Sequence, residues 1–138
     1  MTDLEKAALR GEPSYVWRDG QQRRLEMIAA AAGPRLGGYI LEDGCGVGMY
    51  LARLAPAARL AVGVEVDYPR AREALGIQRR AGVLCAVGEH LPLPANSFDL
   101  TLSHEVLEHV QDDALAVREI VRTLKPGGRL VLFCPNAG

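Results

Sequence analysis

Short apolar segments alternate with helix-like segments along almost the whole of this 138-residue chain. The apolar segments carry few charges, which is typical of strands that are covered on both faces in a parallel sheet. A chain that alternates strands and helices in this way is expected to form a doubly wound α/β fold. In such folds the ligand binds outside the carboxyl ends of the strands. The expected strands are, in order, "GYILE", "RLAVGVEV", "VLCAV", "FDLTLS" and "RLVLFC".

Helix start and stop signals stand between these strands. Residues 21–32 repeat small and aliphatic side chains at helical spacing until Gly33, and they predict a first helix. A short helix is expected to begin at Met49. Asp67 can cap a further helix that has a proline in its first turn and runs toward Leu75.

The last expected helix precedes the strand "RLVLFC". Asp112 and Asp113 stand at its start, where the helix dipole favours negative charge. The segment "KPGG" is expected to end the helix before the strand begins. Its apolar face is predicted to consist of Val117, Ile120, Val121 and Leu124.

The stretch "LEDGCGVG" places Gly44, Gly46 and Gly48 between the first strand and the first short helix. Glycines allow a tight bend and let a ligand approach bare backbone N–H groups. The dinucleotide pattern GxGxxG fails because its third glycine position is Met49. Glu65, about 20 residues further on, is placed to accept hydrogen bonds from ribose hydroxyls. The spacing therefore indicates a nucleoside ligand and gives no indication of a pyrophosphate.

Composition excludes several classes of protein. The formal net charge of −1 gives no broad positive field, which disfavours nucleic-acid binding and membrane-surface binding. Cys45, Cys85 and Cys134 are widely spaced in or beside apolar segments, so they are predicted to be buried free thiols and neither a disulfide framework nor a zinc motif. The charged N-terminus and the absence of a long apolar run predict a protein of the cytoplasm.

Four ordered segments resemble the class I S-adenosylmethionine-dependent methyltransferases, in particular their type 11 subgroup, which includes relatives of the ubiquinone and menaquinone methylation enzymes. "LEDGCGVGMYLARLA" resembles the first motif, in which an acidic residue and any residue precede GxGxG. "VGVEVD" resembles the second-strand motif. "LPLPANSFDLTLSHEVLEHV" resembles the loop, fourth strand and following helix, and "LKPGGRLVLFCPN" the region of the fifth strand. The resemblance implies a mostly parallel sheet in the order 3-2-1-4-5, within one domain over residues 1–138.

The same resemblance divides the domain and suggests its limits. Residues 1–34 are expected to form an N-terminal lead and helix, and residues 35–138 the α/β core. Family members continue past the fifth strand into two more strands, which this chain lacks, so the chain is expected to be truncated relative to the family or to form a homodimer. An uncovered edge at "RLVLFC" would favour pairing with a second copy.

The resemblance implies a set of residues that bind S-adenosylmethionine. The acidic residue and the glycine loop would surround the methionine part, Glu65 would hold the ribose, and Val66 would pack against the adenine. The loop after the third strand would follow the adenine edge, and the end of the fourth strand would approach the methionine end. The implied residues are Glu42, Gly44, Cys45, Gly46, Glu65, Val66, Gly88, Glu89, His90, Leu91, Ser103 and His104. The family usually has Asp at the position of Val87, and its absence removes one adenine contact unless Glu89 or water replaces it.

Several residues allow two interpretations. Glu105, Glu108 and His109 form a triplet that binds a divalent metal in some methyltransferases, but such side chains also bond the neighbouring backbone; we predict no metal site. His104 or His109 could act as a general base or cap a helix. Tyr15 and Trp17 could cover an acceptor, but for aromatic residues before a first helix the predicted role is packing on the core. Cys45 could be a nucleophile, but its place between glycines is better explained by its backbone.

The function predicted from these patterns is methyl transfer by direct displacement to an unidentified small-molecule acceptor. The protein would align acceptor and methyl group and exclude water, so the cofactor motifs assign no catalytic residue. Two alternatives remain at this point. One is a non-catalytic domain that binds S-adenosylmethionine or is the core of a larger enzyme. The other is a nucleotide-dependent oxidoreductase, which the failed third glycine disfavours.

Overall fold

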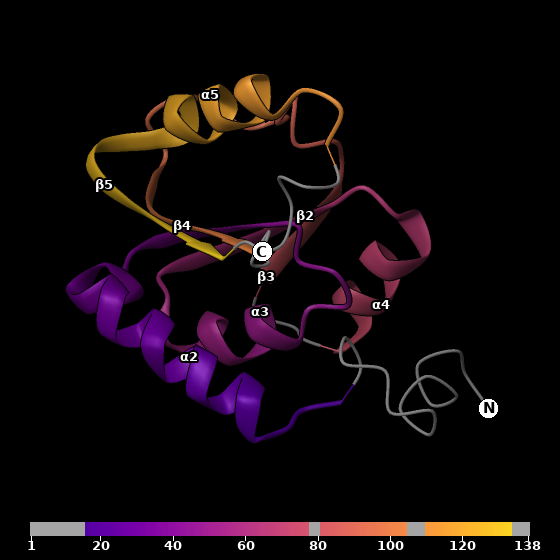
Figure 1. Ribbon diagram of the computed structural model, residues 1–138, viewed down its shortest axis with the longest axis vertical. Helices are drawn as coiled ribbons and strands as arrows, with labels where there is room; N and C mark the ends of the chain where they lie inside the picture. Colours follow the sequence, from indigo (N-terminus) through magenta and orange to yellow (C-terminus); the bar gives the residue numbers. More distant parts are fainter. Residues whose placement is uncertain (1–15, 78–80, 105–109, 134–138) are drawn as a thin grey trace, which may run out of the picture.

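A computed structural model describes residues 16–77, 81–104 and 110–133 of the chain. The elements alternate between strands and helices as expected (Figure 1). The helices are α2 (Asp19–Ala32), α3 (Met49–Leu54), α4 (Tyr68–Ile77) and α5 (Asp113–Thr123), and the short 3-10 turns are η1 (Gly33–Gly37) and η2 (Ala55–Ala57). The strands are β1 (Tyr39–Asp43), β2 (Leu60–Glu65), β3 (Ala81–Cys85), β4 (Phe98–His104) and β5 (Leu124–Phe133).

All five strands form one parallel sheet in the order β3-β2-β1-β4-β5. This confirms the doubly wound fold and the strand order 3-2-1-4-5 that the sequence predicts. The strand order reverses at β1, which pairs with β2 on one side and β4 on the other. The carboxyl ends of these three strands therefore meet where a ligand is expected in this type of fold.

Helices cover both faces of the sheet (Figure 1). On one face, Ile28 of α2 packs with Tyr50 and Leu54 of α3 and with Leu102 of β4. Further along the same face, Leu51 of α3 packs with Ala74 of α4. On the other face, α5 and the segment before β4 cover the sheet, and the buried residues there are Leu41, Val64, Leu91 and Phe98. These two layers of apolar contacts form the core.

Two helix caps agree with the sequence. The backbone N–H of Arg70 donates to Asp67 Oδ2 over 3.1 Å, and the N–H of Leu115 donates to Asp112 Oδ1 over 3.0 Å. Each carboxylate satisfies a backbone donor that the first turn of a helix leaves free. Both predicted starts are therefore confirmed.

The end of α5 differs from the prediction. The helix ends at Thr123, and Leu124 already has the extended backbone of β5, so "KPGG" lies within that strand. Proline disfavours the helical conformation at the residue before it, Lys125, which explains why the helix cannot continue. The buried face also differs: Ala116, Ile120 and Thr123 are buried, whereas Val117 and Val121 are exposed.

The third strand also differs in position and in burial. It spans Ala81–Cys85 instead of "VLCAV", because its register with β2 ends at the pair Glu65 and Cys85. Cys45 is buried as predicted, but Cys85 is exposed because β3 lies at the edge of the sheet. Cys134 lies outside the described residues.

Gly48 fixes how α3 follows the glycine loop. Its φ is +84°, and an added Cβ would lie 3.0 Å from Ala74 Cβ of α4. We expect Gly48→Ala to lower the free energy of unfolding by about 1 to 2 kcal/mol, because a side chain is strained in this conformation. Urea unfolding would measure this change.

Gly76 of α4 provides the matched control. Its added Cβ would meet nothing within 4 Å, so Gly76→Ala should leave the protein equally stable or stabilise it by roughly 0.5 kcal/mol. Equal stability of Gly48→Ala and the unmodified protein would contradict this account of the loop.

Candidate cofactor and acceptor site

The glycine loop after β1 has the conformation that its composition predicts. Gly44, Gly46 and Gly48 have φ values of +78°, +56° and +84°, a region that side chains rarely adopt. The backbone N–H groups of Gly44 and Cys45 donate to the carbonyl oxygen of Val64 over 2.7 and 2.9 Å. An added Cβ at Gly46 would meet nothing within 4 Å. The loop thus turns back over the end of β2 and leaves open space beside Gly46.

Glu65 joins this loop to the end of β2. Its Oε1 accepts the N–H of Gly46 over 2.9 Å, and its Oε2 accepts the N–H of Asp67 over 2.8 Å. The side chain is buried but borders the cavity described below. Each carboxylate oxygen can accept more than one hydrogen bond, so the side chain retains capacity for a ligand.

A cavity of about 1120 Å³ lies at the carboxyl ends of β1 and β2. This volume slightly exceeds the range of about 300–1,000 Å³ that is usual for small-molecule sites. The loop after β1 forms its floor, the N-terminal part of α2 one wall, and the segment after β3 another. The lining residues are Trp17, Gly20, Gln21, Arg24, Glu42, Asp43, Gly44, Cys45, Gly46, Val47, Met49, Tyr50, Val64, Glu65, Val66, Asp67, Arg70, Ala86, Val87, Gly88, Glu89, Val110 and Gln111.

Two further carboxylates border this cavity at the end of β1. Glu42 and Asp43 are both about 1% exposed. Burial raises the pKa of Glu42 to about 8, with smaller contributions from Glu65 and Asp43 against the backbone N–H of Leu51, which lowers it. Burial raises the pKa of Asp43 to about 6, and the negative charges of Glu65 and Glu89 add to this. Glu42 therefore favours its neutral form up to about pH 8, whereas Asp43 favours its neutral form only below about pH 6.

The Cys45 thiol is unsuited to nucleophilic attack. Burial, followed by the charges of Glu42 and Glu65, raises the pKa of this thiol well above its ordinary value. Its side chain packs in the apolar cluster with Leu51, and an added Cβ at Gly63 would lie 2.8 Å from Sγ. A thiol is a poor nucleophile when its thiolate form is disfavoured. The structure thus supports the interpretation in which the backbone of Cys45 matters.

The aromatic side chains near α2 both pack and border the cavity. The rings of Trp17 and Tyr50 are 5.0 Å apart in an edge-to-face arrangement, and the Arg53 guanidinium lies 3.6 Å from the centre of the Trp17 ring. Trp17 also packs against the buried cluster of Ile28 and Leu102. The packing role predicted for Trp17 is thus confirmed, and its position at the cavity is an additional property. Tyr15 lies outside the described residues.

The loop after β3 contributes only part of its predicted residues to the cavity. Gly88 and Glu89 line it, but His90 and Leu91 do not. Leu91 is 5% exposed and packs in the core, and its N–H donates to Glu119 Oε1 over 3.0 Å. The apolar side chain of Leu91 thus turns from the cavity into the core.

Ser103 and His104 are the site residues that the sequence predicts at the end of β4. Ser103 is buried and does not line the cavity, and among the described residues its Oγ has no hydrogen-bond partner. His104 ends β4, but its side chain, like Glu105, Glu108 and His109, lies outside what the structure describes.

Within the described ranges, no group of three or more His, Cys, Asp or Glu residues is arranged to hold a metal ion. In those same ranges, no helix has the length and apolar character needed to cross a membrane.

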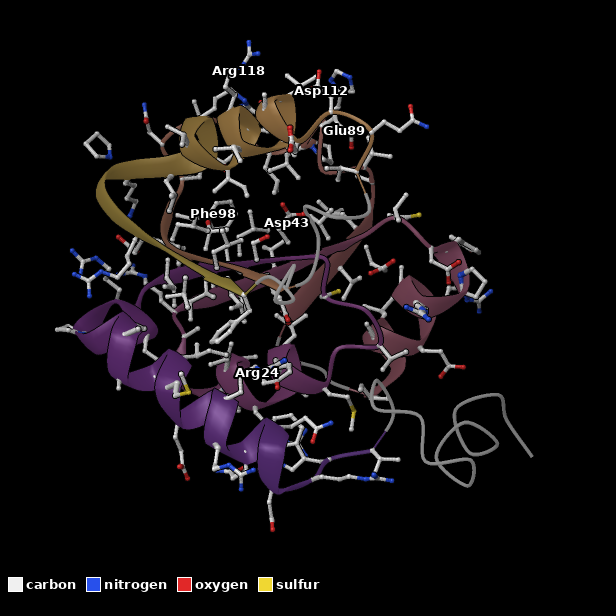
Figure 2. All side chains as sticks on the ribbon, viewed as in Figure 1. Arg24, Asp43, Glu89, Phe98, Asp112 and Arg118 are labelled. Atoms are coloured by element: carbon white, nitrogen blue, oxygen red, sulfur yellow. The ribbon has the colours of Figure 1, made fainter. Side chains whose placement is uncertain are left out.

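Several lining residues were missed by the sequence analysis. Arg24 and Arg70 bring positive charge to the cavity from α2 and from α4, and Figure 2 shows Arg24 on the side of the sheet opposite to Glu89. Asp43 is, after Glu42, a second charged residue at the end of the apolar strand β1, which is a signal that could have been used. The arginines gave no comparable signal, because polar residues are ordinary on exposed helix faces.

Comparison with known proteins adds an independent observation. The methyltransferase domain family matches residues 41–132, which include the glycine loop, Glu65 and the sheet up to β5. This chain belongs to that family. The sequence left a nucleotide-dependent oxidoreductase as an alternative, and this match excludes such a family for the chain.

Individual relatives agree with this membership. A probable S-adenosylmethionine-dependent methyltransferase of Mycolicibacterium smegmatis is 32% identical over 83% of this chain and 45% of its own length. A demethylmenaquinone methyltransferase of Corynebacterium kroppenstedtii is 30% identical over 94% of this chain and 53% of its own length. The crystal structure of the YcgJ protein of Bacillus subtilis is similar with a TM-score of 0.76 and 26% identity, over 80% of this chain and 50% of that one. The chain thus spans about half the length of the curated relatives it matches.

The raised pKa of Asp43 makes stability depend on pH. The folded protein holds the Asp43 proton with a pKa of about 6, whereas the ordinary value is 3.8, so the folded state binds this proton more tightly. The free energy of unfolding therefore falls as the pH rises from about 4 to about 6, and it stays lower above that range. We expect Asp43→Asn, which carries no charge, to raise the melting temperature at pH 8 by about 3 °C or more.

The pH series distinguishes this charge effect from a packing effect. The difference in melting temperature between Asp43→Asn and the unmodified protein should shrink as the pH falls from 6 to 4, and it should approach zero only below the ordinary pKa of 3.8, where the carboxyl group becomes neutral in both states. Differential scanning fluorimetry without ligand would measure it. A variant that is less stable at pH 8, or a difference independent of pH, would contradict the expectation.

Proposed function

We propose that this chain transfers a methyl group from S-adenosylmethionine to a small-molecule acceptor in the cytoplasm. The observation that carries the proposal is the buried carboxylate of Glu65, which accepts the N–H of Gly46 at the border of a large cavity. Gly46 leaves open space beside this carboxylate. Membership of the methyltransferase domain family supports the same reaction.

The residues present fit the chemistry of that cofactor. Glu65 has acceptor capacity left for the two ribose hydroxyls, and Gly46 leaves room beside it. Among the described residues Glu42 Oε1 has no hydrogen-bond partner, and it can accept bonds from the ammonium group of the methionine part. Val66 is 63% exposed and offers an apolar surface for the adenine ring. The N–H of Gly88 is the backbone donor that we assign to the adenine edge.

The chain's own task in this reaction is alignment. When bound, S-adenosylmethionine supplies a methyl group that is already electrophilic because it is attached to a sulfonium. Glu65, Glu42 and the glycine loop would fix the position of the donor, and the wall formed by α2 would restrict water and orient the acceptor. This division requires no acid or base among the described residues.

The acceptor is proposed to lie against α2. Trp17 supplies an aromatic surface there and Arg24 supplies a positive charge, a combination that suits a planar or acidic small molecule. The demethylmenaquinone methyltransferase among the relatives supports an aromatic acceptor as the first class to test. Incubation with S-adenosylmethionine and a set of small phenols, followed by mass spectrometry, tests for a gain of one methyl group.

A homodimer through β5 forms part of the proposal. Within the described residues β5 is an edge strand, and Leu132 is 43% exposed on it. Unpaired strand edges favour pairing with another strand. Light scattering at high concentration would show twice the mass of the chain; a single species of monomer mass would contradict the dimer but leave the proposed reaction unaffected.

Replacement of Glu65 tests the proposed function directly. We expect Glu65→Gln to weaken the binding of S-adenosylhomocysteine by about tenfold or more, because charge-assisted hydrogen bonds to the ribose are lost. Isothermal titration calorimetry would measure the two dissociation constants.

Glu26→Gln is the matched control. Glu26 is an exposed residue of α2 and does not line the cavity, so this variant should bind like the unmodified protein. Equal affinity of Glu65→Gln and the unmodified protein would overturn the proposed cofactor position. Tighter binding of NAD than of S-adenosylhomocysteine would overturn the proposed function.

A further inference from the structure

Glu42 and Asp43 approach the cavity from opposite faces of β1. Successive residues of a strand point to opposite faces, and paired residues of neighbouring parallel strands point to the same face. Glu42 is paired with Leu102, which packs against α2 and α3. Asp43 is paired with Ser103 and therefore lies on the α5 side, as Figure 2 shows. One strand end thus presents two carboxylates to different parts of the same cavity.

Asp43 lacks a partner that its burial would normally require. It is 1% exposed and borders the cavity, and within the described residues its Oδ2 accepts no hydrogen bond. A buried carboxylate without donors is costly, and native structures usually supply such donors. A bound ligand is one source of them.

Gly88, Val110 and Glu89 lie beside Asp43, and none of these described residues donates a hydrogen bond to Oδ2. An added Cβ at Gly88 would lie 3.8 Å from both Asp43 carboxylate oxygens and 3.5 Å from Val110 Cγ1. Glu89 stands on the same wall, where its Oε2 accepts the N–H of Gln111 over 3.2 Å. The wall beside Asp43 is therefore glycine, an apolar side chain and a second acid.

The elements that border Asp43 place acidic side chains next to it. Glu65 of β2 and Glu89 after β3 both raise its pKa, and Glu42 precedes it on β1. Arg24 of α2 and Arg70 of α4 border the cavity, but neither is among the groups that set the pKa of Asp43. A cavity wall with this balance attracts a cation.

We propose that Asp43 is a ligand-binding carboxylate of this cavity in addition to Glu42 and Glu65. It binds a positively charged group on the cofactor or on the acceptor. This inference rests on the proposed function. The acidic position of the methyltransferase motif is Glu42, and position 43 is one at which the motif allows any residue, so the motif does not account for Asp43. Two sources of the positive charge share the same chemistry: the sulfonium or ammonium group of the cofactor, and a protonated amine on the acceptor.

Asp43→Asn tests the proposal because it keeps the shape of the side chain and removes its charge. Calorimetric titrations at pH 8 would use three probes: S-adenosylmethionine, S-adenosylhomocysteine, and benzylammonium added to protein saturated with S-adenosylhomocysteine. We expect a loss of about tenfold or more for at least one of them, as charge-assisted hydrogen bonds are lost. Benzyl alcohol, a neutral analogue of benzylammonium, should be unaffected.

The pattern of losses identifies the source of the charge. An equal loss for both nucleosides indicates the ammonium of the cofactor, and a loss for S-adenosylmethionine alone indicates the sulfonium. A loss for benzylammonium alone indicates an acceptor amine. Each loss should shrink at pH 5, where Asp43 is neutral in the unliganded protein. A merely structural role would not produce this pH dependence.

Two controls keep the test decisive. Glu26→Gln should leave all affinities unchanged, and Asp43→Ser repeats the charge removal with a smaller side chain if Asp43→Asn folds poorly. Unchanged affinity for all three probes in a folded variant would overturn the role of Asp43 while leaving the proposed function intact. An unmodified protein that binds neither nucleoside would overturn the proposed function, and this inference with it.

Discussion

The carboxylate of Glu65 is the interaction on which the geometry of the site depends. By accepting the N–H groups of Gly46 and Asp67, it connects the loop after β1 to the start of α4. This bond fixes the backbone at Gly46, which has no side chain to pack, whereas its neighbours Cys45 and Val47 are held by burial of their own side chains. The same side chain borders the cavity, so the group that positions the loop is also available to a ligand. One residue at the end of β2 thus positions the loop and, under the proposed function, also binds the ligand.

This arrangement lowers the stability of the folded protein for an electrostatic reason. Glu42, Asp43 and Glu65 are buried close together, and the two residues of β1 have strongly raised pKa values as a result. An apolar pair at the end of β1 would give a more stable sheet, since buried charges without partners are unfavourable. A cation bound as proposed for Asp43 would offset part of this loss of stability, because ligands that bind only the folded state stabilise it.

The sequence predicts the sheet better than it predicts the ends of its elements. Near-continuous apolar runs identify the strands, most clearly the central β1, β2 and β4, because burial on both faces leaves few other choices. The start of α5 could be predicted from Asp112, whose capping bond is local in sequence. The register of β3 could not, because pairing with β2 decides it, and neither could the exposure of Cys85, which follows from the edge position of that strand. Local signals predict local structure, and long-range pairing requires the fold.

The residues of the candidate site also differ in how well the sequence predicts them. Gly44, Gly46 and Glu65 were predictable because they belong to one strand–loop–helix unit and its neighbour. Leu91 was placed at the cavity by its position in a loop, but the hydrogen bond between its N–H and Glu119 of α5 holds its segment against the core, 28 residues away in sequence. Arg24 lines the cavity because the packing of α2 on one face of the sheet brings the N-terminal part of this helix beside the ends of the strands. Cavity residues of this kind therefore come from elements whose position depends on tertiary packing. The glycine loop and Glu65 can be inferred from sequence, whereas the cavity wall formed by α2 must be read from the three-dimensional arrangement.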